Sequence, residues 1–213
     1  MGIAVLTCIG VGAAFGQEAK KKAVKDQGEY DLFDGATKAT DPNKKLQLLT
    51  TWKEKYPESD YKEDRLKLIL TTYQALGQGA KMADVAKEIL AANPTDVTAL
   101  YWLSLLTQSM PVTPDSLATG DKAAQGLLAA KKPDAVKDSD WTPMKKEFDV
   151  IGHKTLGFIA EKNKDFETAE KEYVKVLELN PAVAEVSYQL GLAILQQKKP
   201  ERQAEAIYHF ARA

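Results

Sequence analysis

The chain has 213 residues, 44% of them apolar, which is enough to bury a substantial core. Its 29 basic and 30 acidic residues leave a net charge of −1, and this near-balance argues against a protein that binds the phosphate backbone of nucleic acids. The single cysteine, Cys8, lies near the start, so residues 17–213 contain no disulfide, thiolate metal ligand or cysteine nucleophile.

Residues 1–16, MGIAVLTCIGVGAAFG, form an apolar stretch without charge. Ala14 and Gly16 are small residues at the two positions that a signal peptidase reads, so the stretch predicts a signal peptide cleaved before Gln17 and an exported, periplasmic or secreted protein. It is shorter than the ~20 apolar residues that cross a bilayer. No basic residue precedes the apolar run, and an uncleaved anchor is the alternative. Only that anchor would make the membrane a partner.

Residues 17–27 contain a cluster of lysines and predict a disordered basic leader to the first helix. Further along, apolar residues recur at the spacing of one helical face between 66 and 73. Gly77 and Gly79 interrupt this face, and a second one follows between 82 and 90. The pattern predicts two helices joined by a tight turn.

A longer helix is predicted near the middle of the chain. Thr142-Pro143 is a favourable start, because threonine caps free amides and proline suits the first helical position. The helix is expected to end near Lys162, and Asn163-Lys164-Asp165 forms the turn, with Asp165 capping the next helix.

All prolines fall where we place helix ends or connectors. They are Pro42, Pro57, Pro94, Pro111, Pro114, Pro133, Pro143, Pro181 and Pro200. A proline inside a helix costs roughly 3 kcal/mol, so this distribution favours an all-helical chain. No useful length of sequence shows the alternation typical of strands.

Two Leu-Gly pairs, Leu156-Gly157 and Leu190-Gly191, open similar segments one after the other. The residues between them include Ala169 and Tyr173, and Asn180-Pro181 closes the unit. This pattern resembles the tetratricopeptide repeat (TPR), a helix–turn–helix unit of ~34 residues with Leu-Gly, a later Ala and aromatic residue, and a closing Pro. The two Leu-Gly pairs are separated by this same repeat length. Gly157 and Ala169 are small where the two helices are expected to cross closely.

The resemblance extends in register over most of the chain and implies an all-α, right-handed α-solenoid of about five helical hairpins, the last incomplete. The expected units are 28–60, 61–96, 97–133, 142–183 and 184–213. Units one to three form one block (28–133) and units four and five another (142–213). Residues 134–141 are expected to connect the two blocks.

The sequence offers no convincing catalytic residue, metal site or cofactor motif. His153 follows Asp149 by four residues, so the two share a helical face, yet no third metal ligand is evident. His209, the other histidine, has no nearby acidic pattern. Serine elbows and glycine-rich phosphate loops are also missing from the sequence. We therefore expect a protein that is not an enzyme, with no metal, cofactor or small-molecule substrate.

The resemblance to TPR proteins implies a scaffold that binds a peptide or protein partner on the concave side of the solenoid, where the first helix of each repeat lies. The matching positions are Lys67, Thr71, Tyr101, Lys154, Phe158, Tyr188 and Leu192. The apparent leader adds cell-envelope assembly as one possible setting. The alternative is a regulatory or targeting arm of a larger enzyme whose catalytic domain lies beyond residue 213.

Overall fold

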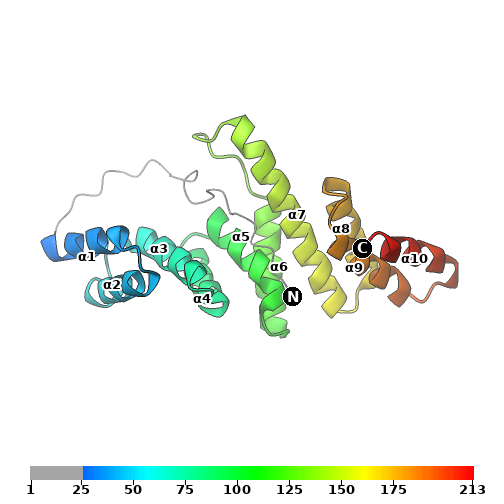
Figure 1. The fold of residues 1–213 in the computed structure, drawn as a ribbon, viewed down its shortest axis with the longest axis horizontal. Helices are drawn as coiled ribbons and strands as arrows, with labels where there is room; N and C mark the ends of the chain where they lie inside the picture. Colours follow the sequence, from blue (N-terminus) through cyan, green and yellow to red (C-terminus); the bar gives the residue numbers. More distant parts are fainter. Residues whose placement is uncertain (1–25) are drawn as a thin grey trace.

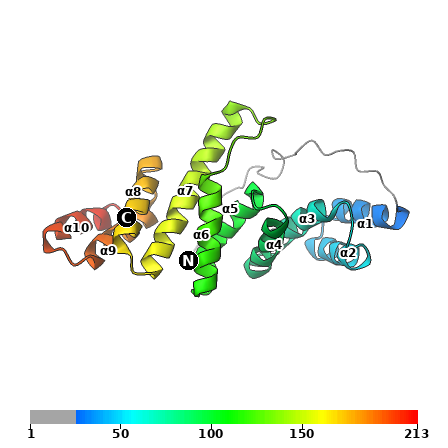
Figure 2. The ribbon, with the colours of Figure 1, turned by 180° about the vertical axis from the view of Figure 1, so that it is seen from behind.

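The computed structural model describes residues 26–213, which form ten α-helices and no strand. The helices follow one another as a row of antiparallel hairpins, with α1 and α2 at one end and α9 and α10 at the other (Figure 1, and from behind in Figure 2). The expected all-α solenoid of five hairpins is confirmed. In chain order the elements are α1 (Gln27–Lys38), α2 (Pro42–Lys55), α3 (Lys62–Ala75), α4 (Gly79–Ala92), α5 (Val97–Leu106), the 3₁₀ turn η1 (Thr107–Ser109), α6 (Pro114–Leu128), α7 (Asp138–Lys162), α8 (Phe166–Leu179), α9 (Ala184–Gln196), the 3₁₀ turn η2 (Pro200–Arg202) and α10 (Gln203–Ala211).

The predicted signal peptide (1–16) and all but the last two residues of the predicted leader (17–27) lie outside the described residues. Asp26 is the N-cap of α1, and Gln27 is the first residue of that helix. Among residues 26–213, no helix combines the length and the apolar character that crossing a membrane requires.

Side-chain caps fix where several helices begin. The carboxylate of Asp165 accepts a hydrogen bond from the Thr168 amide at 3.1 Å, as the sequence predicted for the start of α8. Asp96 caps α5 in the same way through the Ala99 amide at 2.9 Å. Each bond satisfies one of the amides that a helix start leaves unpaired, so the hairpins begin at defined residues.

The start of α7 differs from the prediction. The helix begins at Asp138 rather than at Thr142, which places Pro143 inside it and makes residues 138–141 of the predicted connector helical. Residues 129–137 separate α6 from α7. Pro143 lies in the second turn of α7, where its missing amide removes one backbone hydrogen bond. The Thr142 hydroxyl donates to the Asp138 carbonyl at 2.9 Å and supports this turn. Eight prolines lie at helix ends or connectors as expected, and Pro143 is the exception.

Two buried clusters make up the core, and α7 contributes to both. The first cluster runs from α1 to Phe148 on α7, and the second runs from Ala160 on α7 to Ala206 on α10. With 25 residues, α7 is the longest helix described, and it packs against α5, α6 and α8. It crosses the middle of the row and joins the two halves (Figure 1).

The Leu-Gly pairs mark places where the two helices of a hairpin approach closely. A Cβ atom added to Gly157 would lie 2.5 Å from Cε1 of Tyr173, and one added to Gly191 would lie 2.6 Å from Cε1 of Phe210. Each glycine is on the first helix of its hairpin and each aromatic ring on the second. The expected close crossing at Gly157 is therefore confirmed, and the ring fills the space that a side chain would occupy.

A buried arginine joins the first two hairpins. Arg65 on α3 is 1% exposed, and its guanidinium donates to the backbone carbonyls of Trp52 and Tyr56 at 3.1 and 2.8 Å. The guanidinium carbon lies 5.5 Å from the centre of the Trp52 ring. Arg65 thereby adds a second donor to carbonyls at the end of α2, since Trp52 also accepts the Tyr56 amide and Tyr56 the Ser59 amide.

The close approach at Gly157 yields a stability prediction. We expect Gly157→Ala to lower the free energy of unfolding by about 1–2 kcal/mol, because displacing the buried Tyr173 ring costs up to ~3 kcal/mol while the gain in helix propensity is ~1 kcal/mol. Urea unfolding followed by circular dichroism measures the change.

Gly35 on α1 provides the matched control. A Cβ atom there would meet Leu48 at 3.5 Å, an ordinary van der Waals contact, so Gly35→Ala should raise the free energy of unfolding by about 0.5–1 kcal/mol. Stabilisation by both substitutions would contradict the account of Gly157.

Candidate protein-binding surface

The positions predicted for partner binding lie on the first helices of hairpins two to five. Lys67 and Thr71 lie on α3, Tyr101 on α5, Lys154 and Phe158 on α7, and Tyr188 and Leu192 on α9. The surface formed by the exposed side chains of α3, α5, α7 and α9 is called the first-helix face. The structure divides the predicted residues into an exposed group and a buried group.

Tyr101 and Phe158 belong to the buried group. Tyr101 is 4% exposed, its hydroxyl donates to Glu147 at 2.9 Å, and its ring meets Phe148 edge-on. Phe158 is 9% exposed, with the Lys162 ammonium 4.9 Å from the ring centre. Neither side chain offers a partner an exposed ring, so neither residue is suited to anchor a partner.

The exposed apolar residues of the first-helix face are concentrated on α9. Tyr188 is 49% exposed, Leu192 is half-buried one turn later, and Leu195 is 45% exposed. Their spacing of four and then three residues puts the side chains on one stripe of the helix. The Tyr188 ring packs 5.4 Å from that of Phe210 on α10, which holds it in place while leaving half of it open.

Sequence reasoning missed two exposed residues of this face. Leu105 on α5 is 45% exposed and lies one repeat length after Thr71, so the repeat register alone could have identified it. Leu195 also escaped the prediction, because its counterpart one repeat earlier is Glu161, a charged residue.

The lysines of the first-helix face are neutralised by neighbouring carboxylates. The Lys154 ammonium lies 2.7 Å from Glu185, which links α7 to α9, and the Lys67 ammonium lies 3.0 Å from Asp96. Thr71 is exposed, but its hydroxyl donates to the Lys67 and Leu68 carbonyls of its own helix. The face therefore presents exposed apolar side chains between internally paired charges.

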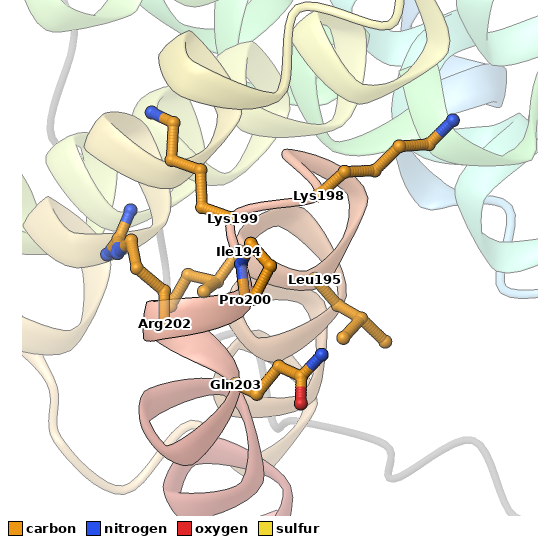
Figure 3. Close-up of a pocket in the computed structure, with 7 residues that line it drawn as sticks. All are labelled: Ile194, Leu195, Lys198, Lys199, Pro200, Arg202 and Gln203. Carbon is orange, nitrogen blue, oxygen red and sulfur yellow. The ribbon is translucent and has the colours of Figure 1, made fainter.

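A small cleft lies at the tip of the last hairpin, next to the stripe. Its volume is about 280 Å³. It is lined by Ile194, Leu195, Lys198, Lys199, Pro200, Arg202 and Gln203. The side chains of Lys198 and Lys199 extend in opposite directions, whereas Leu195 and Gln203 point to the same side (Figure 3). The volume falls below the ~300–1,000 Å³ of typical small-molecule sites, so we treat the cleft as the end of the α9 surface.

The two histidines have different surroundings. His153 Nδ1 lies 2.6 Å from a Glu172 carboxylate oxygen, and Asp149 pairs with Lys145 instead of His153. Burial tends to raise the pKa of Glu172, but hydrogen bonds from Lys175 and His153 outweigh it, and the pKa is lowered. His209 is half-buried, and burial lowers its pKa. Within residues 26–213, no group of three or more His, Cys, Asp or Glu side chains is arranged to hold a metal ion.

Comparison with solved structures supports the fold. A crystal structure of MamA matches with a TM-score of 0.62 and 16% identity, over 86% of this chain and 88% of that one. MamA from residue 41 to its end, from Desulfovibrio magneticus RS-1, matches with a TM-score of 0.61 and 14% identity, over 89% and 94%. TTC0263, described as a thermophilic TPR protein in Thermus thermophilus, is 16% identical over 87% and 89%, but its TM-score of 0.43 carries no argument by itself.

No protein-family model and no curated protein sequence matches the chain. The repeat units in the sequence coincide with the helical hairpins of the structure. In units four and five, the glycine of the Leu-Gly pair faces an aromatic ring. The chain is a TPR-like repeat protein. Sequence identities as low as those to the solved structures establish the fold and nothing finer.

Arg202 attaches the last TPR-like unit to the one before it. Its guanidinium donates to both carboxylate oxygens of Glu170 on α8, at 2.7 and 2.8 Å, and to Glu205 on α10 at 2.8 Å. Hydrogen bonds from Arg202 and Gln197 lower the pKa of Glu170. Because Tyr188, Leu192 and Leu195 belong to the same unit, this ion pair helps to hold the stripe in position.

The Glu170–Arg202 pair predicts how stability responds to acid. A carboxylate whose pKa is lowered by folding stabilises the protein above its unfolded pKa, ~4.3, and this stabilisation is lost as the pH falls through the lower folded pKa. We expect Glu170→Gln to lower the free energy of unfolding by about 1–2 kcal/mol at pH 7, because charged hydrogen bonds are lost. At a pH well below the folded pKa, the variant and the unmodified chain should be equally stable.

Urea unfolding at pH 7 and at low pH measures this difference. Glu167→Gln is the control, because Glu167 lies on the same helix as Glu170 and forms an exposed pair with Lys199. Its loss should cost less than about 0.5 kcal/mol. An equal loss for Glu170→Gln at both pH values would show that the pair acts through packing and not through charge.

Proposed function

We propose that the chain is a non-catalytic scaffold that binds a protein or peptide partner on its first-helix face. The observation that carries the proposal is the stripe of Tyr188, Leu192 and Leu195, with Leu105 exposed on α5. Large apolar side chains exposed along one face of a repeat protein are suited to binding another chain, because stacked repeats present an extended surface.

The paired charges and exposed apolar side chains of the first-helix face indicate which kind of partner it suits. Lys154 and Lys67 are paired with carboxylates of this chain, so the face gives little net charge to an acidic or basic ligand. An apolar stripe bordered by neutralised pairs fits the apolar side of an amphipathic helix or an extended apolar segment. Neither nucleic acid nor a small-molecule substrate is part of this proposal.

We further propose that the chain acts outside the cytoplasm, in cell-envelope assembly. The support is the uncharged apolar start of the sequence and the small residues Ala14 and Gly16.

Partner binding should depend on Tyr188 and not on His153. We expect Tyr188→Ala to weaken the complex by about 1–2 kcal/mol, because aromatic side chains supply much of the energy of protein interfaces. His153→Ala should leave affinity nearly unchanged, since His153 is half-buried between α7 and α8 beside Glu172. Partners captured from the periplasmic fraction by the unmodified chain provide the ligand, and calorimetry gives the affinities.

Circular dichroism controls for folding, because Tyr188 also packs against Phe210. If His153→Ala abolished binding while Tyr188→Ala left it intact, the proposal of a non-catalytic scaffold would be wrong. A chemical role for His153 would then have to be considered.

Export gives a separate prediction. N-terminal sequencing of the protein isolated from the cells that make it should begin near Gln17, as expected for cleavage after Gly16. A cytoplasmic product that retains Met1 would contradict export while leaving the scaffold proposal intact.

A further inference from the structure

A hydrogen-bonded pair between the two helices of the fourth unit has a different counterpart in the fifth. In the fourth unit, His153 Nδ1 on α7 lies 2.6 Å from a carboxylate oxygen of Glu172 on α8. Ser187 on α9 lies one turn before the glycine of its unit, as His153 does. His209 on α10 directly precedes the aromatic residue that faces this glycine, as Glu172 does. The last hairpin thus has a serine and a histidine where the preceding one has a histidine and a carboxylate.

These two side chains have buried polar atoms without a partner. The Ser187 hydroxyl oxygen and His209 Nδ1 make no hydrogen bond with any of residues 26–213. Ser187 is 1% exposed, and His209 is half-buried. A neutral imidazole can leave Nδ1 without a hydrogen, whereas both ring nitrogens of a protonated one carry a hydrogen to donate. Protonation of His209 would therefore put a positive charge and an unmet donor at a buried atom, which is costly.

The charged groups around His209 offset this cost only in part. Glu205 lies one turn earlier on α10 and Glu170 lies on α8, and both carboxylates accept hydrogen bonds from Arg202 in η2. Arg202, together with Arg212 at the end of α10, brings positive charge towards the imidazole. Burial is the largest effect, and with the two arginines it lowers the pKa of His209 against the opposing effect of the two carboxylates.

Other ionisable side chains of the last unit have contacts of their own. On α9, Glu185 forms an ion pair with a lysine of α7, and the ring of Tyr188 packs against α10. Glu201 in η2 is exposed. On α10, the ring of Tyr208 meets the His209 ring edge-on, with the ring centres 5.3 Å apart. None of these contacts supplies His209 with a carboxylate partner.

The helix that carries His209 depends on its contact with α9. With 9 residues, α10 is shorter than the ~12–15 residues below which an isolated helix is marginal in water. Its inward side consists of Ala206, which is fully buried, and of His209 and Phe210, which are half-buried. Ile207 and Tyr208 point outward and are exposed, and both ribbon views place α10 at the outer end of the row (Figures 1 and 2). A charge on His209 therefore acts on one of three inward contacts.

We propose that the last hairpin is an acid-sensitive switch, in which protonation of His209 releases α10 from α9. Release takes Phe210 away from the ring of Tyr188, 5.4 Å from it, and so removes the support of the exposed stripe of α9. Acid then weakens partner binding at this stripe, a consequence that rests on the proposed function. The pair in the fourth unit responds in the opposite way, because a protonated His153 gains an ion pair with Glu172.

The direction of the pH effect follows from the lowered pKa of His209. A histidine whose pKa is lowered by folding binds its proton more readily once its helix is released. The closed hairpin therefore has its full stability above the ordinary histidine pKa of ~6.5 and loses stability as the pH falls from there towards the folded pKa.

Hydrogen exchange of the chain, followed by mass spectrometry at about pH 7.5 and 5.5 and expressed as protection factors, tests the release. We expect the protection of α10 to fall at least ~threefold on acidification relative to that of α4, whose unit contains no histidine. His209→Gln removes the titrating group and should abolish this loss. His153→Gln is the matched control, because it removes a histidine from the equivalent contact one unit earlier, and it should leave the loss in α10 in place.

Ser187→Asp tests the same contact from α9. A carboxylate at this position recreates, with the partners exchanged, the pair that His153 forms with Glu172, so acid should no longer release α10. Each comparison is between two pH values of one variant, so a general loss of stability does not affect it.

Equal protection of α10 at both pH values in the unmodified chain would overturn the proposal. A loss that persists in His209→Gln would also overturn it, because another group would then be responsible. The exchange measurement uses no partner, so its outcome decides the acid release of α10 separately from the proposed function.

Discussion

The close contact between a glycine and an aromatic ring sets the geometry on which the C-terminal half of the solenoid depends. Gly157 lets the Tyr173 ring of α8 lie directly on α7, and Gly191 lets the Phe210 ring of α10 lie directly on α9. Interiors packed this densely have no room for an extra side chain, so the ring fixes both the distance and the register of the two helices. The Phe210 ring also supports Tyr188, so the packing of the hairpin and the exposed stripe of α9 are physically connected.

The second unit reaches similar packing with the sizes exchanged. In the repeat register, Gly157 and Tyr173 correspond to Leu70 and Ala86 of the second unit, both fully buried in one cluster. A large residue on the first helix facing a small one on the second fills a comparable volume. This exchange explains why the second unit folds like the fourth and fifth although it has Leu70 at the position where they have the glycine of the Leu-Gly pair.

Sequence reasoning therefore predicted what local patterns determine, including the helical class, the hairpin register and the Asp165 cap. It placed the start of α7 one turn too late, because Thr142-Pro143 resembles a helix start and only packing shows that the preceding turn is helical. It did not anticipate that Tyr101 is buried, since that depends on contacts with Phe148 and Glu147, which lie far along the chain.

The hairpins pack closely on one another, and the first-helix face exposes apolar side chains beside paired charges. The most direct test of partner binding is photo-cross-linking in the cells that make the protein, with benzoylphenylalanine in place of Tyr188 or, as control, of the exposed Lys171 on α8. We predict a discrete cross-linked protein from position 188, other than the chain itself, and none from 171. Equal cross-linking from both positions, or from 171 alone, would contradict the assignment of binding to the first-helix face.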